Sequence, residues 1–100
     1  MSQTANPARG EATVAGHVLR PSFAALVAAE QELGPLFALV DRAGDGRLTL
    51  AEISALFWHC LHERPDGLTR EGFGNALCTL GLAALMPPLR ALLGQILAGR

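Results

Sequence analysis

Two segments of the chain repeat apolar residues at the spacing of one helix face. In the first, residues 49–62, the apolar positions follow the i, i+3, i+4, i+7, i+8 pattern without a miss: Ile53, Leu56, Phe57, Cys60 and Leu61. Thr49 and Glu52 precede them at the spacing of a capping box, in which the two side chains satisfy free N–H groups at a helix start. We therefore predict a helix over 49–62 with its apolar stripe turned to the core.

The second segment lies near the end of the sequence and carries the same pattern. Its stripe is formed by Leu89, Leu92, Leu93, Ile96 and Leu97. Pro87 and Pro88 come directly before it, and proline inside a helix removes a backbone hydrogen bond and clashes with the preceding turn. Proline is well suited to the first helical position, however. The pattern predicts a break at 87–88 and a helix that begins at Pro88.

Cap residues mark three further short helices. Ser22 caps a helix over 23–33 that Gly34 ends, Pro35 begins a short helix, and Thr69 caps a helix that Gly81 ends. The expected apolar positions are Phe23, Leu26, Val27 and Leu33 in the first, Leu36, Phe37, Leu39 and Val40 in the second, and Phe73, Ala76, Leu77 and Leu80 in the third.

A β-hairpin is predicted before these helices. A two-residue turn at Ala15-Gly16 pairs Val14 with His17 and, further out, Glu11 with Arg20, which is a favourable charge pair. A lone two-stranded hairpin is not stable in water, so we expect it to pack on the helices or to pair with the edge of another chain. Its edge, from Glu11 to Arg20, is therefore a candidate surface for self-association by strand addition.

These elements predict a mainly α protein with a small N-terminal β-hairpin, an α+β arrangement. The hairpin is followed by four or five short helices in one compact bundle. One hundred residues suffice for one small domain, so we assign 1–8 to a flexible N-terminal tail and 9–100 to a single domain.

Composition narrows the classes of function. Half of the residues are apolar, the net charge is −1, and the eight basic residues are all arginines spread singly along the chain. A nucleic-acid partner is not expected without a basic stripe. Neither a signal peptide nor an apolar run of about 20 residues is visible, so no membrane partner is expected. Two cysteines outside any C-x-x-C spacing fit a reducing compartment as two small buried side chains, and we expect a cytoplasmic protein.

The segment "DRAGDGRLTLAE" at 41–52 resembles a calcium-binding EF-hand loop. Asp41, Asp45, Gly46 and Glu52 occupy positions 1, 5, 6 and 12, and Arg47 occupies position 7, which binds through its backbone carbonyl. Position 3 is alanine, so one of the four side-chain ligands is missing. A turn followed by a helix cap explains the same residues. We favour the turn and cap, with no metal or other cofactor, and keep Ca²⁺ binding as the alternative.

Three stretches together carry a resemblance to a known family: "NPARGEATVAGHVLRPSFAALVAAEQELG", "LTLAEISALFWHCL" and "GLAALMPPLRALLGQIL". Their order and spacing resemble the small tail-gene protein of phage-like gene transfer agents over about residues 6–98. In that family an N-P-x-R-G-E opening leads into a hairpin, and a capped helix and a terminal G-L-A-aliphatic helix follow.

The resemblance implies a tail assembly chaperone, although some family names describe a tail tube protein. Such a chaperone binds the tape measure protein, keeps its apolar helices soluble and assists the tail tube protein in assembling around it. It brings no enzymatic activity and no cofactor. Because tubes are built from sheets whereas this chain is mostly helical, we favour the chaperone over a structural tube component. The acidic loop departs from what the family needs.

Partner-binding residues are sought among apolar side chains. One candidate set is the terminal stripe of Leu89, Leu92, Leu93, Ile96 and Leu97, with plain core packing as its alternative. Another candidate is Trp58, which lies off the 53–61 stripe and is either an exposed interaction residue or part of a second packing face. We expect Cys60 in the core and His59 and His62 on the surface. No catalytic triad context surrounds Ser22 or Ser54, so no enzyme is predicted.

Overall fold

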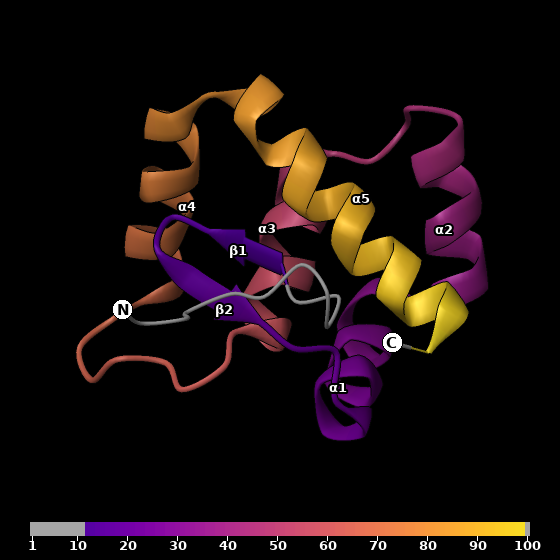
Figure 1. Ribbon diagram of the computed structural model, residues 1–100, viewed down its shortest axis with the longest axis horizontal. Helices are drawn as coiled ribbons and strands as arrows, with labels where there is room; N and C mark the ends of the chain where they lie inside the picture. The colour runs from indigo at the N-terminus through magenta and orange to yellow at the C-terminus, as the bar shows by residue number, and fades with distance from the viewer. Residues whose placement is uncertain (1–11, 100) are drawn as a thin grey trace.

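The structure is a computed structural model that describes residues 12–99. A hairpin leads into five helices (Figure 1), as the sequence predicts. The elements are β1 (Ala12–Val14), β2 (His17–Leu19), α1 (Phe23–Leu33), α2 (Leu36–Gly44), α3 (Leu50–Cys60), α4 (Arg70–Leu80) and α5 (Leu82–Ala98). The predicted N-terminal tail and the Glu11 to Arg20 pair involve residues outside this range.

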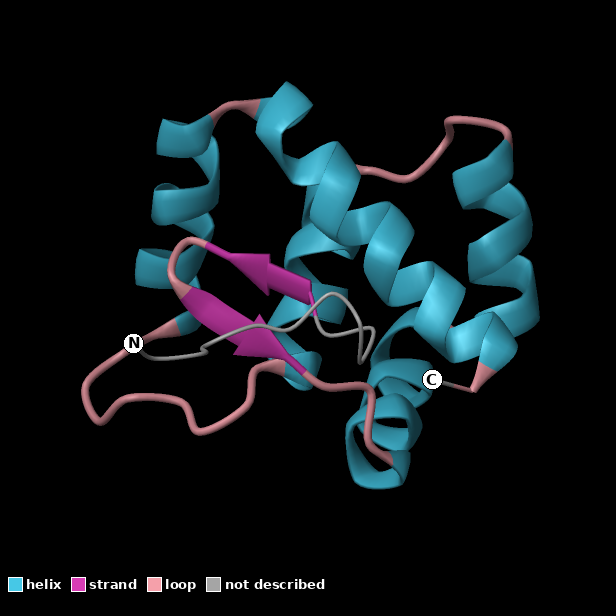
Figure 2. Ribbon diagram, in the orientation of Figure 1, coloured by secondary structure: helices cyan, strands magenta, loops and turns pink. Residues whose placement is uncertain are grey.

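The hairpin has the predicted register and rests on the helices. Val14 pairs with His17 across a turn in which Ala15 and Gly16 have φ values of 51° and 79°. Both values are positive, as a type I′ turn requires. β1 packs against α5, and Figure 2 shows the strands lying together among the surrounding helices.

The outer edge of β2 is occupied within the described part of the chain. The predicted helix over 49–62 ends two residues early, at Cys60. Leu61 then forms an antiparallel bridge with Leu19, and the N–H of His62 donates to the carbonyl of Val18 at 2.9 Å. These backbone contacts with β2 take the place of the helical hydrogen bonds predicted for residues 61 and 62. Of the two hairpin edges, the predicted strand addition by a second copy would therefore have to use that of β1.

The helix starts follow the predicted caps. The hydroxyls of Ser22, Thr49 and Thr69 each accept the N–H of the residue three positions on, at 3.2, 3.1 and 2.9 Å. The capping box is complete, because Glu52 accepts the N–H of Thr49 at 2.9 Å. Pro35 differs slightly from its prediction, since it is the N-cap residue and α2 begins at Leu36.

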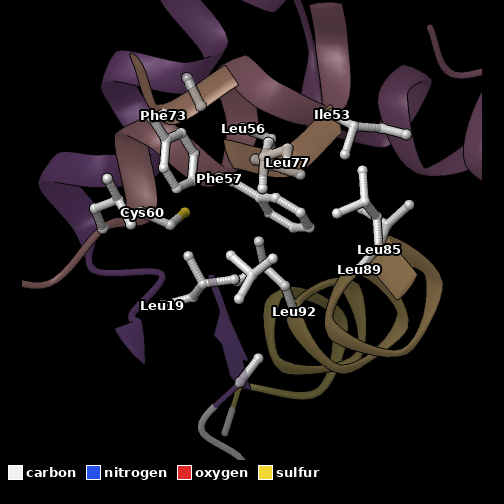
Figure 3. Close-up of a cluster of buried hydrophobic side chains, with 14 of the residues drawn as sticks. Leu19, Ile53, Leu56, Phe57, Cys60, Phe73, Leu77, Leu85, Leu89 and Leu92 are labelled. Carbon is white, nitrogen blue, oxygen red and sulfur yellow. The ribbon is translucent and has the colours of Figure 1, made fainter. Parts of the chain in front are cut away.

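The core is built around α3. Every residue of its predicted stripe is buried, from Ile53 to Leu61. Figure 3 shows the Phe57 ring pointing from α3 toward leucines of α5, with Leu19 of the hairpin nearby. Burial raises the pKa of the Cys60 thiol to about 12, so Cys60 is the core residue that the sequence predicts.

The predicted break at 87–88 is wrong. Helix α5 is continuous over 17 residues, with both prolines inside it. Leu85, Leu89 and Leu92 share one buried face across the prolines, so burial holds both halves in one helix. The carbonyls that lose their proline partners belong to Ala83 and Ala84, two exposed residues that water can reach.

Several apolar side chains are more exposed than their helix pattern predicts. Phe23 was expected on the buried side of α1 but is 85% exposed, because it is the first residue of the helix and no element lies over it. Leu80, at the end of α4, is also exposed. Cys78, expected to be buried, lies exposed on α4.

Among the described residues no single helix has the length and hydrophobicity to cross a membrane; only two sharply bent helix pairs, α1 with α2 and α4 with α5, reach those values together.

Candidate functional site, an apolar groove beside α5

An apolar hollow lies between α5 and the α2–α3 segment. Its volume is about 550 Å³, and its lining is almost wholly apolar. The α5 wall consists of Met86, Leu89, Arg90, Leu93, Gly94 and Leu97, and the opposite wall of Val40, Ala43, Gly44, Gly46, Leu48 and Ile53. We call this hollow, together with its extension described next, the α5 groove.

A second hollow of about 330 Å³ continues the first toward the start of α5. The two share Leu48, Ile53 and Met86, and the second adds Leu82 and Leu50. Four exposed large apolar side chains therefore lie along one groove, namely Leu50, Leu82, Met86 and Leu97. Helix α5 is about 25 Å long at 1.5 Å per residue, so the groove has the length of a short helix.

The packing of α2 explains why the groove stays open. The main packing neighbour of α2 is α1, and Leu39 is its one fully buried residue. Small residues on both walls, Ala43, Gly44 and Gly94 among them, leave space that larger side chains would fill. The C-terminal end of α2 is held to α3 by an ion pair between Arg42 and Glu52.

The groove contains one ionisable lining residue, Arg90, which is exposed. Two acidic residues near the groove, Glu52 and Asp45, already have partners. The Thr49 N–H and the Arg42 guanidinium lower the pKa of Glu52. Asp45 pairs with Arg47 at 3.6 Å. The site is thus an apolar channel with a single positive charge on its rim.

The structure divides the predicted terminal stripe. Leu89 and Leu92 are buried in the core, with exposed fractions of 5% and 0%. Ile96 is partly buried and packs against that core. Leu93 and Leu97 line the groove, where Leu97 is 60% exposed. Core packing therefore accounts for Leu89, Leu92 and Ile96, whereas Leu93 and Leu97, together with one side of Leu89, line the groove.

Trp58 lies away from the groove. It is partly buried, with its ring centroid 6.0 Å from that of Phe73, and the Arg64 guanidinium lies 4.4 Å from the centre of its ring. These contacts match the second packing face rather than a freely exposed interaction residue.

The calcium-ligand candidates are not brought to one point. Helix α2 runs through Asp41 to Gly44, so the first third of the supposed loop is helical. Glu52 is engaged by the capping box and by Arg42, and Asp45 by Arg47. Among the described residues no group of three or more His, Cys, Asp or Glu side chains is placed to hold a metal ion.

An ion cluster joins α1, α3 and α4 on another face. Arg70 donates to both oxygens of the Glu32 carboxylate, at 3.0 and 2.9 Å, and His59 Nε2 lies 2.7 Å from one of them. His59 was predicted on the surface, but its side chain is only 18% exposed because of this contact. His62 is 35% exposed and lies 3.1 Å from Arg20. The cluster connects three helices and leaves the groove untouched.

Comparison with known protein families gives a match over residues 10–99 to the family described as phage tail tube protein, GTA-gp10. The chain belongs to this gene transfer agent tail protein family. The match spans the hairpin and all five helices, so the resemblance seen in the sequence is confirmed. The comparison with curated proteins found no match, and neither did the comparison with solved structures.

Sequence reasoning missed most of the groove in this tail protein. Leu82, Met86 and Arg90 were not among the candidates, because the predicted break at the prolines separated the first two from the terminal stripe. Carrying the 3.6-residue period across Pro87 and Pro88 would have placed all three beside Leu93 and Leu97. The wall from α2 and the 45–49 loop had no comparable signal, because only tertiary packing places it opposite α5.

Proposed function

We propose that this tail protein is a non-enzymatic assembly chaperone that acts in the cytoplasm by binding an apolar helix of the tape measure protein in the α5 groove. The observation that carries the proposal is the groove itself. Amphipathic helices bind apolar grooves through side chains at i, i+3, i+4 and i+7, and the α5 groove has the length and the apolar lining for that mode. Membership of a tail protein family supports a tail component as the partner.

The secondary structure supports a chaperone over a tube subunit. A tube wall made of sheet requires strands long enough to pair between neighbouring subunits. The described strands have three residues each, and one edge of the hairpin is occupied by Leu61 and His62. The helices and the groove instead suit transient binding of another helix while the tube protein assembles.

Co-expression with the tape measure protein tests the proposal. The wild-type chain is expected to co-purify with it, and two groove variants, Leu97→Asp and Gly94→Gln, to lower the amount captured about tenfold or more, because each puts a polar group where an apolar helix would be buried. Gly94→Gln is structurally mild, since a Cβ at Gly94 meets no heavy atom within 4 Å.

Matched controls lie outside the groove. Leu80→Asp introduces the same charge at an exposed leucine of α4, and Ala91→Gln introduces the same amide at an exposed position of α5. Both controls are expected to retain capture, with circular dichroism showing that all four variants are folded. Equal capture by groove and control variants would contradict the proposal. Stoichiometric presence of this chain in purified particles would favour a structural tail component instead.

A further inference from the structure

Arg90 differs from the other arginines that the structure describes. Arg42, Arg47 and Arg70 have carboxylate partners. Arg20 lies against His62, and Arg64 lies over the Trp58 ring. Within the described range, residue 90 is the one arginine with no ion pair, hydrogen bond or aromatic partner. It is also the one charged residue of α5 and the one ionisable residue that lines the groove.

A bound apolar helix would change the surroundings of this guanidinium. In the free protein Arg90 is exposed and solvated by water. Covering the groove removes part of that water, and a charge that loses water without gaining a partner opposes binding. A carboxylate on the bound helix would compensate through a charge-assisted, two-pronged hydrogen bond, which is the geometry that arginine favours.

The α5 helix of a second copy is a poor occupant for the same reason. Arg90 lies halfway between Leu82 and Leu97, the two ends of the exposed row on α5. Pairing two α5 helices antiparallel across a two-fold axis would place the two Arg90 side chains together near its centre. Helix α5 contains no acidic residue to separate them. The charge pattern therefore selects a different, acidic partner.

We propose that the α5 groove is selective for an amphipathic helix whose apolar stripe is flanked near its middle by a glutamate or aspartate that pairs with Arg90. This inference rests on the proposed function in that it specifies which helices the same groove accepts. It adds a specificity-determining residue, since apolar contacts provide affinity whereas the charge pair selects the sequence and register of the bound helix.

Designed peptides test this selectivity without using the tape measure protein. Three helical peptides of about 18 residues carry the same leucine stripe and differ at one central flanking position, which is Glu, Gln or Lys. Titration calorimetry with the full chain is expected to show the Glu peptide binding about tenfold more tightly than the Gln peptide, and the Lys peptide most weakly. Arg90→Gln should remove the difference between Glu and Gln, and Arg90→Glu should reverse the order of Glu and Lys.

The outcomes separate this inference from the proposed function. An order of affinities that does not change in the Arg90 variants would overturn the selectivity, even if the tape measure protein co-purifies. An α5-dependent dimer in sedimentation experiments that Gly94→Gln abolishes would also overturn it, because a second copy would then be the occupant. The predicted order together with failed co-purification would uphold the selectivity and reject the tape measure protein as the partner.

Discussion

Glu32 connects three helices through one carboxylate. Its side chain is 39% exposed, yet both oxygens accept hydrogen bonds from Arg70, and His59 lies against one of them. The Arg70 hydrogen bonds, followed by the His59 contact, lower the pKa of Glu32 to about 2, and Glu32 in turn raises the pKa of Arg70. This surface cluster is therefore a source of acid-sensitive stability.

The expected pH dependence follows from the sign of that shift. The carboxyl has an ordinary pKa of 4.5 in the unfolded chain and about 2 in the folded protein. Below about pH 5 the unfolded state binds the proton first, so the stabilisation is present above that range and is lost as pH falls toward 2. Glu32→Gln should be less stable than the wild type at pH 7 and should lose less stability than the wild type between pH 5 and 2. Urea titrations across this pH range measure the free energy of unfolding of both proteins. If the two free energies fall in parallel with pH, Glu32 is not the source of the acid sensitivity.

At the scale of elements, local signals and tertiary burial compete in α5. Pro87 and Pro88 oppose a helix interior, whereas the buried face of Leu85, Leu89 and Leu92 requires one. Burial prevails, because three leucines placed in the core each contribute about 1.5–3 kcal/mol. Burial contributes less in the short helix α2, which has one buried residue. Its contacts with α1 and the Arg42–Glu52 ion pair hold it in place.

Removing one of these prolines should stabilise the protein. Pro87 is exposed, and Pro87→Ala restores the N–H that can donate a helical hydrogen bond to the Ala83 carbonyl. The gain in helix propensity, up to about 3 kcal/mol, exceeds the roughly 0.4–1 kcal/mol lost by loosening the unfolded chain. We expect an increase of about 1–2 kcal/mol in the free energy of unfolding. Thermal and urea denaturation check this, with Ala91→Gln as a control on the same helix. A decrease in the free energy of unfolding would contradict the prediction and show that Pro87 stabilises α5.

At the scale of the whole molecule, Leu19 joins the hairpin to the bundle. It is fully buried, bridges to Leu61 and contacts the core that α3 and α5 share. The strands are too short to be stable alone, so they depend on these contacts. We therefore expect the hairpin and the helices to unfold as one unit.

Leu19→Ala tests this dependence. The loss of buried methyl groups and the resulting cavity should cost about 2–5 kcal/mol, a large part of the stability of a small domain. The fluorescence of Trp58, the single tryptophan, and far-ultraviolet circular dichroism should still report one common transition. Two separate transitions would show that the hairpin is an independent unit.

Most of the fold was determined by the sequence alone. The three caps and the Ala-Gly turn depend on contacts between residues a few positions apart, so they could be predicted from spacing. The buried face of α3 could be predicted from the helical period of its apolar residues. The predictions were wrong where the outcome depends on distant segments. The helix predicted to reach His62 ends at Cys60 because His62 bonds to β2, and Phe23 is exposed because no described element covers it.

The groove depended on tertiary structure. The sequence supplied the leucines of α5, but it did not show which of them would lie in the core and which would face open space. That division was decided by where α3 and β1 pack on α5 and by α2 packing on α1 instead. Local spacing determines which face of a helix is apolar, whereas the positions of neighbouring elements determine how much of that face remains free to bind a partner.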